Sequence, residues 1–398
     1  METNVGRKRS LAFLGAAHAL NHSMFVITPP LLSLIMTSLS TNIFEIALVS
    51  TIASFIFGTG ALLGGPLGDR IGEIRMITIC LALTGISTFL MLAAESIGGI
   101  YVYALALSLM ALWASLYHPI ANSLILKVFK TNAPEAMGIH GVGGTVGIVL
   151  APAMAWFVGI TFGWPWAFVI FGTLTASLAV VFARTPEYRR ESNIKRTKLL
   201  GALKIRALRA VLILNIMIGL FMKGVELFFP TYLRNNRGID PTWSSIAYTL
   251  LLAVGVAGQW TGGKAGSILG CRKTVMLTMA GVCLSLVSLL LLPFYFAGTA
   301  LFVVLYGFFF YAHQPALNAL VGFVTPSEQQ GAVFGIYFFT SFGIGSLSQL
   351  FAGYIAELYG LDASFYLLTA FAALALLLSS RLPDEKKCAT EAASSGRL

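Results

Sequence analysis

The chain has 398 residues, of which 57% are hydrophobic and only 11% are charged, and its mean hydropathy is +0.83. A soluble globular domain carries about 25% charged residues, so this composition excludes that class and indicates an integral membrane protein. The net charge of +10 does not indicate a nucleic-acid partner, because the basic residues gather on one side of the lipid bilayer in the topology predicted below.

Twelve apolar segments are long enough to cross a bilayer as helices, which takes about 20 residues. The start Arg7-Lys8-Arg9, followed by an apolar run, imitates a signal peptide. Hydrophobicity continues well past that run, so we expect a first transmembrane helix instead of a signal peptide.

We therefore predict an all-α integral membrane protein of twelve transmembrane helices. They lie at roughly 11–36, 43–67, 75–94, 100–126, 137–159, 164–183, 209–233, 243–265, 273–296, 299–323, 330–353 and 362–381.

A basic segment interrupts the apolar pattern between the sixth and seventh spans. We predict an N-terminal six-helix bundle over 1–183, a cytoplasmic basic linker over 184–208, and a C-terminal six-helix bundle with a short cytoplasmic tail over 209–398. All Lys and Arg residues then lie on one side of the membrane, with three exceptions, and the positive-inside bias makes that side cytoplasmic. Both termini are expected in the cytoplasm, and the expected location is the cell (inner or plasma) membrane. The exceptions are Lys223, Arg234 and Arg237.

A glycine-rich motif at 64–75, between the second and third spans, returns in weaker form at 262–273. Glycine permits tight turns and close approach of helices. A second repeat pairs residues 117–124 of the fourth span with 313–320 of the tenth, at an offset of 196. Two parallel six-helix repeats are typical of transporters that rock one half against the other. The glycines of the first motif that have a glycine 198 positions later are Gly64, Gly65, Gly68 and Gly72.

These features together resemble the major facilitator superfamily across nearly the whole chain. Three segments, 17–22, 117–119 and 137–147, are similar to its fosmidomycin-resistance branch, and 147–152 is similar to the helix-5 motif of proton-coupled exporters. That branch commonly has an acid directly after the helix-1 Asn, where this chain has His22. The resemblance implies a monomeric drug/proton antiporter that is not an enzyme and uses no cofactor.

The resemblance also implies a gating role for charged and small residues of the first motif and the fifth span. A carboxylate at a cytoplasmic helix end can bind helix N-termini or basic groups in one conformation and release them in the other. The second motif has Ser267 and Ile268 where the first has an acid and a base, so this latch would be confined to the first half. The predicted gating residues are Gly65, Gly68, Asp69, Arg70, Gly72, Arg75, Gly147 and Pro152.

Polar residues inside the predicted spans supply the candidate substrate site. A neutral histidine in a bilayer seeks a cavity or a polar partner, and all five histidines fall inside spans. Four residues of the first span are three and four positions apart, so they share one helical face. The alternative is that each polar group makes a satisfied hydrogen bond between helices. His140 is expected only to fix the end of the fifth span. The predicted substrate-binding residues are His18, Asn21, His22 and Phe25, with Tyr117, His118 and Asn122 of the fourth span and Tyr311, His313, Gln314 and Asn318 of the tenth.

Lys223 and Glu226 lie three residues apart in the seventh span. Either charge alone would cost roughly 2.5–3.5 kcal/mol at mid-helix, and as neighbours they can neutralise each other. Glu226 is the only carboxylate well inside a predicted span, which makes it the leading proton carrier. The alternative is a structural ion pair near the outer end of the helix. We predict that Glu226, Lys223, His18 and His22 couple transport to protons.

We therefore predict a secondary active transporter with alternating access, which exports a small anionic or zwitterionic organic compound, such as a phosphonate-like drug, in a proton-coupled cycle. The alternative is a proton-coupled importer of a small organic metabolite. A remote alternative is a His-ligated membrane metalloenzyme, because His18 and His22 have the spacing of a metal-ligand pair. The other histidines stand singly in the sequence, without Cys or acid partners at ligand spacing, so we expect no metal.

Overall fold

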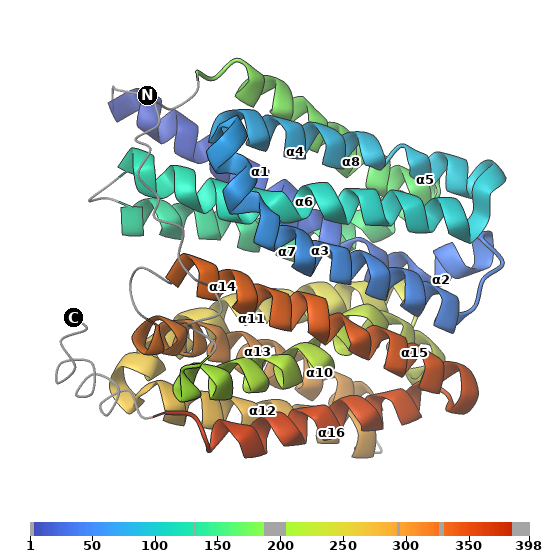
Figure 1. Ribbon diagram of the computed structural model, residues 1–398. Helices are drawn as coiled ribbons and strands as arrows, with labels where there is room; N and C mark the ends of the chain where they lie inside the picture. The colour runs from blue at the N-terminus through green and yellow to red at the C-terminus, as the bar shows by residue number, and fades with distance from the viewer. Residues whose placement is uncertain (1–3, 130–132, 187–203, 293–294, 326–329, 384–398) are drawn as a thin grey trace. The chain divides into compact units, whose positions relative to one another are not determined.

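The computed structural model describes residues 4–129, 133–186, 204–292, 295–325 and 330–383, and all regular structure in these ranges is helical (Figure 1). The N-terminal part contains α1 (Asn4–Val26), α2 (Thr28–Ser38), α3 (Ile43–Ile71), α4 (Glu73–Ser87), α5 (Leu90–Ala93), a π-helical turn (Ala94–Gly98), α6 (Gly99–Phe129), α7 (Ala133–Phe162) and α8 (Trp164–Ala183). The C-terminal part contains α10 (Arg206–Arg237), α11 (Pro241–Leu269), α12 (Cys271–Leu291), α13 (Tyr295–Val324), α14 (Gln330–Phe338), α15 (Leu347–Tyr359) and α16 (Leu361–Ser379).

Among the described residues, ten helical stretches are long and apolar enough to cross a membrane, or eleven when α1 and α2, which meet at 45°, count as one bent crossing. One of these stretches, Glu73–Phe129, holds 57 residues. It turns back on itself at Gly99, where φ is +53°, so that α4 and α6 pack against each other. This stretch therefore makes two crossings, and the arrangement is consistent with the twelve predicted helices.

The chain divides into two compact units. The first comprises Met1–Ser192 with the short segments Phe229–Thr231 and Asp240–Thr249, and the second comprises the rest. Most of the predicted linker, 187–203, lies outside the described residues, as does the tail from residue 384. Within the first unit α4 packs on α6 and α8, and within the second α12 packs on α13 and α16. The repeat in the sequence therefore corresponds to matching helix pairs in the two units.

The two glycine-rich motifs have the same local structure. Gly72 joins α3 to α4 with φ at +110°, and Gly270 joins α11 to α12 with φ at +91°. Residues with a side chain rarely adopt this backbone conformation. A glycine at both positions therefore allows one helix to end and the next to begin without a longer loop.

Glycines also set how closely the helices approach. A Cβ on Gly64 of α3 would lie 2.3 Å from Cγ of Pro119 in α6, and a Cβ on Gly262 of α11 would lie 2.0 Å from the carbonyl oxygen of Ala312 in α13. Each contact joins two helices of the same unit. Small residues at such crossings allow close van der Waals packing. This packing stabilises helix pairs in a membrane, where the hydrophobic effect does not drive helices together.

The eleventh predicted span combines three kinds of helix. Between α14 and α15 the backbone passes through a π-helical turn at Phe339–Gly343 and a 3₁₀ turn at Ile344–Ser346. The Nδ2 atom of Asn215 in α10 donates to the Tyr337 carbonyl oxygen at 2.7 Å and to Thr340 Oγ1 at 2.9 Å. Asn215 of α10 thus forms hydrogen bonds with the eleventh span where its regular α-helix is interrupted.

We expect Gly64→Ala to destabilise the protein and Gly65→Ala to leave its stability unchanged or to raise it by up to about 1 kcal/mol. A Cβ on Gly64 meets Pro119 and the Leu116 carbonyl, whereas a Cβ on Gly65 has nothing within 4 Å. Overpacking costs about 1–3 kcal/mol, and replacing glycine by alanine in a helix otherwise gains up to about 1 kcal/mol. Thermal unfolding of the two variants in detergent, followed by tryptophan fluorescence, checks the difference. Equal melting temperatures would contradict it.

Candidate functional site: a histidine cluster and an ion pair within one helix

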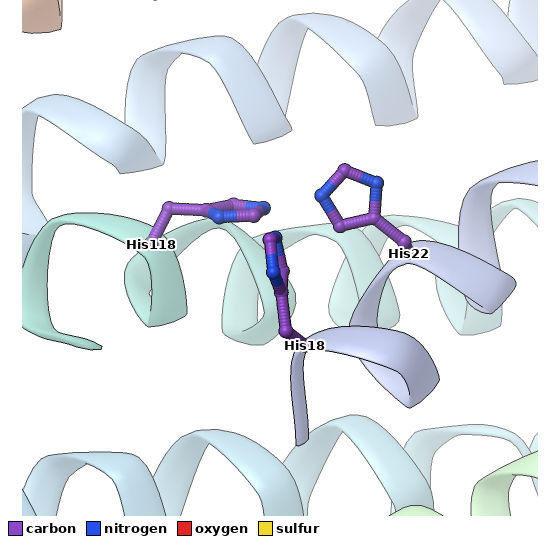
Figure 2. Close-up of side chains that lie close together, drawn as sticks. All are labelled: His18, His22 and His118. Atoms are coloured by element: carbon purple, nitrogen blue, oxygen red, sulfur yellow. The ribbon is translucent and has the colours of Figure 1, made fainter. Parts of the chain in front are cut away.

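Three histidines of the first unit lie together. His18 and His22 come from α1 and His118 comes from α6, and one ring nitrogen of each lies within 4.8 Å of the others. The ring centroids are 4.4, 5.0 and 5.0 Å apart, and the ring planes are nearly perpendicular, at 82°, 81° and 88°. Figure 2 shows the three rings converging from the two helices. All three residues are half-buried. We call them the histidine cluster.

His140 of α7 lies against the cluster and orients it. Its ring stacks on that of His18, with centroids 4.0 Å apart and planes 7° from parallel. Nδ1 of His18 donates a hydrogen bond to the His140 carbonyl oxygen at 2.7 Å. Because a carbonyl oxygen can only accept, the proton of the neutral His18 ring sits on Nδ1. Nε2 of His18 therefore presents a lone pair.

A fully buried tyrosine fixes the ring of His140 in turn. The hydroxyl of Tyr117 donates to the Leu14 carbonyl oxygen at 2.8 Å and lies 3.1 Å from Nε2 of His140. Because the hydroxyl hydrogen is directed at Leu14, the tyrosine oxygen accepts the Nε2–H of His140. One chain of polar contacts thus connects α1, α6 and α7.

Glycines of α7 make room for this arrangement. A Cβ on Gly144 would lie 2.6 Å from Cε1 of His18, and a Cβ on Gly147 would lie 2.0 Å from the Ala19 carbonyl oxygen. By contrast, a Cβ on Gly141 would have nothing within 4 Å. Residues 140, 144 and 147 recur at helical spacing, so they share the face of α7 that meets α1.

The other predicted site residues of the first unit lie around the cluster with different contacts. Nδ2 of Asn21, a residue only 2% exposed, donates to the Ala114 carbonyl oxygen at 3.0 Å. Asn21 therefore makes a hydrogen bond between two helices, which is the alternative role predicted from the sequence for these polar residues. Phe25 packs edge-on against Phe57 with ring centroids 4.3 Å apart. Asn122 of α6 is half-buried.

The predicted site residues of α13 belong to the second unit. His313 is buried, and its Nδ1 donates to the Phe310 carbonyl oxygen, one turn earlier in the same helix. The ring of Tyr311 lies over Gly255 of α11, where a Cβ would be 2.3 Å from Cδ2 of the ring. Both side chains are thus held by contacts within their own unit.

The repeat relates the environments of the two helices as well as their sequences. At the offset of 196, the buried Tyr117 of α6 corresponds to the buried His313 of α13, and the half-buried His118 corresponds to the half-buried Gln314. Asn318, the next predicted residue of α13, is exposed. Its equivalent in α6, Asn122, is half-buried, so two of these three equivalent pairs have similar burial and the third does not.

Lys223 and Glu226 form an ion pair within α10, with Nζ 2.8 Å from Oε2. The two side chains differ in burial, because that of Lys223 is 8% exposed and that of Glu226 is 28% exposed. The ammonium group also lies 4.5 Å from the ring centroid of Phe342, in the π-helical turn before α15. The carboxylate is therefore the more accessible partner of the pair.

The charged residues with a predicted gating role lie where α3 ends and α4 begins. The side chain of Asp69 lies outside the described residues, while Arg70 and Arg75 are exposed. The latch stays a prediction.

The small residues with a predicted gating role lie on α3 and α7 and in the turn at Gly72. A Cβ on Gly68 would lie 3.1 Å from a side chain of α6, whereas Gly65 has open space at this position. Gly147 packs on α1, as described above, and Pro152 lies inside α7. Three of these five residues, Gly68, Gly72 and Gly147, therefore have a packing or turn role that their local geometry explains.

Sequence reasoning gives two residues of the cluster region less weight than the structure does. His140 stacks on His18 and accepts its hydrogen bond, so it does more than end a helix, and Gly144 leaves room for the same ring. The other histidines stand singly in the sequence but not in the fold, because His118 and His140 join His18. His140 is 122 positions away from it, and only the packing of α7 on α1 brings the two together. The helical spacing of residues 140, 144 and 147 is the one available signal.

The sequence of residues 11–349 matches the family model of the Major Facilitator Superfamily. This chain is a member of that superfamily. It is therefore a multi-pass membrane transporter and not an enzyme, which removes the metalloenzyme alternative.

Two proteins resemble this superfamily member in sequence. It is 25% identical over 321 residues to the fosmidomycin resistance protein of Escherichia coli (strain K12), covering 78% of this chain and 76% of that protein. It is 22% identical over 410 aligned positions to the hexuronate transporter of Bacillus subtilis (strain 168), covering 96% of each. The two relatives are named for different compounds.

Solved structures of other transporters have the same fold. The TM-score is 0.80 to a bacterial homologue of the human lysosomal transporter Spinster, in an inward-facing and occupied conformation, with 18% identity over 96% of this chain and 98% of that one. It is also 0.80 to a mutant of the nucleoside transporter NupG, with 14% identity over 94% of this chain and 99% of that one. At these identities the similarity concerns the fold alone.

A double-mutant cycle checks the ion pair. We expect Lys223→Met and Glu226→Gln each to destabilise the protein by about 1–3 kcal/mol, less than the 3–5 typical of a fully buried pair, because Glu226 is partly exposed. The double variant should be less destabilised than the sum of the two changes, since it leaves no unpaired charge. Unfolding in detergent measures all four proteins. Strict additivity would show that the two charges do not interact.

Proposed function

We propose that this transporter exports small anionic or zwitterionic organic compounds, phosphonate-like or carboxylate-like, in a proton-coupled cycle of alternating access. The similarity to the fosmidomycin resistance protein supports this substrate class and direction. The observation that supports coupling most strongly is the Lys223–Glu226 pair inside an apolar helix. A cell membrane with both termini in the cytoplasm and a monomeric state are part of the same proposal.

Glu226 is the proposed proton carrier. It lies well inside α10, far from either end of that helix, and its side chain is more exposed than that of its partner. A proton on Glu226 removes the negative charge and leaves the ammonium group of Lys223 without a counter-charge. A buried uncompensated charge is costly. Proton uptake would therefore change the balance between conformations that bury Lys223 and conformations that expose it, which is what alternating access requires.

The histidine cluster is the proposed substrate contact of the first unit. Its three half-buried rings offer several ring nitrogens in a small volume. With one acid set against Lys223 and several histidines, the polar groups inside the spans are neutral to positive in total. That balance favours anions over lipophilic cations. The remaining predicted contacts from α6 and α13 stay part of this proposal.

Import of a small organic anion is a second candidate function. The similarity to the hexuronate transporter covers 96% of both chains, and a hexuronate is a sugar carboxylate. An anion that replaced Glu226 as the partner of Lys223 would travel together with the proton that Glu226 takes up. This linkage between proton and anion would give cotransport in one direction.

We expect Glu226→Gln to abolish solute-driven proton movement. Purified protein in liposomes containing a pH-sensitive dye would be given fosmidomycin or small carboxylates, with Lys223→Arg as the matched variant that keeps the charge. The amide cannot take up the proton, so the dye signal should be lost while the protein stays folded. Proton movement that survives in the amide variant would remove Glu226 as the carrier.

The sign of the same dye signal separates export by exchange from import by cotransport. When solute is added outside the liposomes, exchange drives protons out and makes the lumen alkaline, whereas cotransport makes it acidic. We expect an alkaline lumen for the exporter. An acidic lumen would favour the importer, and cationic dyes that compete well with the anions would contradict the proposed substrate class.

A further inference from the structure

The histidine cluster has the features of a metal-binding site that the transport function does not require. One ring nitrogen from each of His18, His22 and His118 lies within 4.8 Å of the others. Imidazole is a preferred ligand of zinc, copper, iron and nickel ions. We propose that the histidine cluster binds one divalent transition-metal ion of this kind through its three imidazole rings.

The hydrogen bonding of His18 supports the proposal. Its Nδ1–H donates to the His140 carbonyl oxygen at 2.7 Å, so its Nε2 carries a lone pair and no hydrogen. A metal-bound histidine characteristically donates its other ring N–H to a carbonyl or carboxylate, which fixes the ring and raises the basicity of the ligand nitrogen. The backbone of α7 therefore supplies to His18 the contact that orients a metal ligand.

The ring geometry is also suitable. The three ring planes are mutually close to perpendicular, so no ring of the cluster covers another. Zinc–nitrogen bonds of about 2.0–2.1 Å in a tetrahedron place the ligand nitrogens about 3.3 Å apart. The widest separation here is 4.8 Å or less, so an ion would draw the nitrogens together by about 1.5 Å at most. Side-chain rotation can provide that movement.

The surroundings limit where the ring of His18 can go. His140 stacks on one side of it at 4.0 Å. On α7, a Cβ on Gly144 would lie 2.6 Å from the Cε1 atom of His18. Any residue larger than glycine at this position would therefore displace the ring of His18. The cluster thus has one ligand whose ring is held in place by α7, while its other two ligands come from the next turn of α1 and from α6.

Three protein ligands leave one tetrahedral position open, as in catalytic zinc sites. A carboxylate or phosphonate oxygen of the transported compound would fit that position. This consequence rests on the proposed function, whereas metal binding itself does not, because it is measured without transport.

Cobalt(II) titration of the chelator-treated protein in detergent tests the proposal, because visible d–d absorption reports the coordination geometry. The protein should be purified without a histidine tag. We expect one Co²⁺ per chain, displaced by Zn²⁺, and binding weaker by about tenfold or more for His18→Ala, His22→Ala and His118→Ala. His313→Ala, which removes a buried histidine of the second unit, should bind as tightly as the wild type.

Two further substitutions keep the test decisive if an alanine variant fails to fold. His22→Cys should retain binding and gain a sulfur-to-cobalt charge-transfer band, which only direct coordination produces. Gly144→Ala should weaken binding although it removes no ligand, while Gly141→Ala, with open space around its Cβ, should not. A folded His22→Cys protein that binds Co²⁺ without this band would contradict coordination by residue 22.

No saturable Co²⁺ binding in the wild type would overturn the proposal. So would binding that is unchanged when any two of His18, His22 and His118 are replaced, or that is lost equally in His313→Ala. None of these results would affect proton-coupled transport through Glu226, which is measured separately in liposomes.

Discussion

The absence of water from the interior of a bilayer governs this structure more than any single contact. Every polar group placed there needs a partner within the protein. Lys223 has Glu226, Asn21 has a carbonyl of α6, and His18 has the carbonyl of His140. Each of these partners fixes a side chain in one orientation. The polar groups of the candidate site are thus prepared by the same requirement that makes the helices stable in lipid.

Glycine makes these partnerships possible by letting helices approach. Backbone contact between α1 and α7 at Gly147 brings His140 within hydrogen-bonding distance of His18. With a larger residue on that face the two helices would separate, and the carbonyl would no longer reach the ring. Close packing and the polar site are therefore one feature of the helix pair α1 and α7.

The helices and their repeat could be predicted from the sequence because hydrophobicity and glycine spacing are local or periodic signals. The turn at Gly72 and its equivalent at Gly270 follow from such a signal. The ion pair could be predicted in the same way, since its two residues lie three apart in one helix.

The histidine cluster could be predicted only in part. The spacing of His18 and His22 shows one face of α1, but nothing local indicates that His118 joins it or that His140 stacks behind it. These contacts depend on how α6 and α7 pack on α1, which is a property of the whole unit. The apparent isolation of these histidines along the chain is why the sequence alone predicts no metal.

The interrupted eleventh span has a mechanical consequence. A continuous α-helix resists bending because its hydrogen bonds act together along its whole length, and sharp bends form at π-helical turns and similar interruptions. The chain at 339–346 is such an interruption, so any bend between α14 and α15 is expected at this joint. Phe342, which covers the ammonium group of Lys223, lies at that joint. Any tilt there would change the electrostatic environment of the buried charge directly, without a relay through other helices.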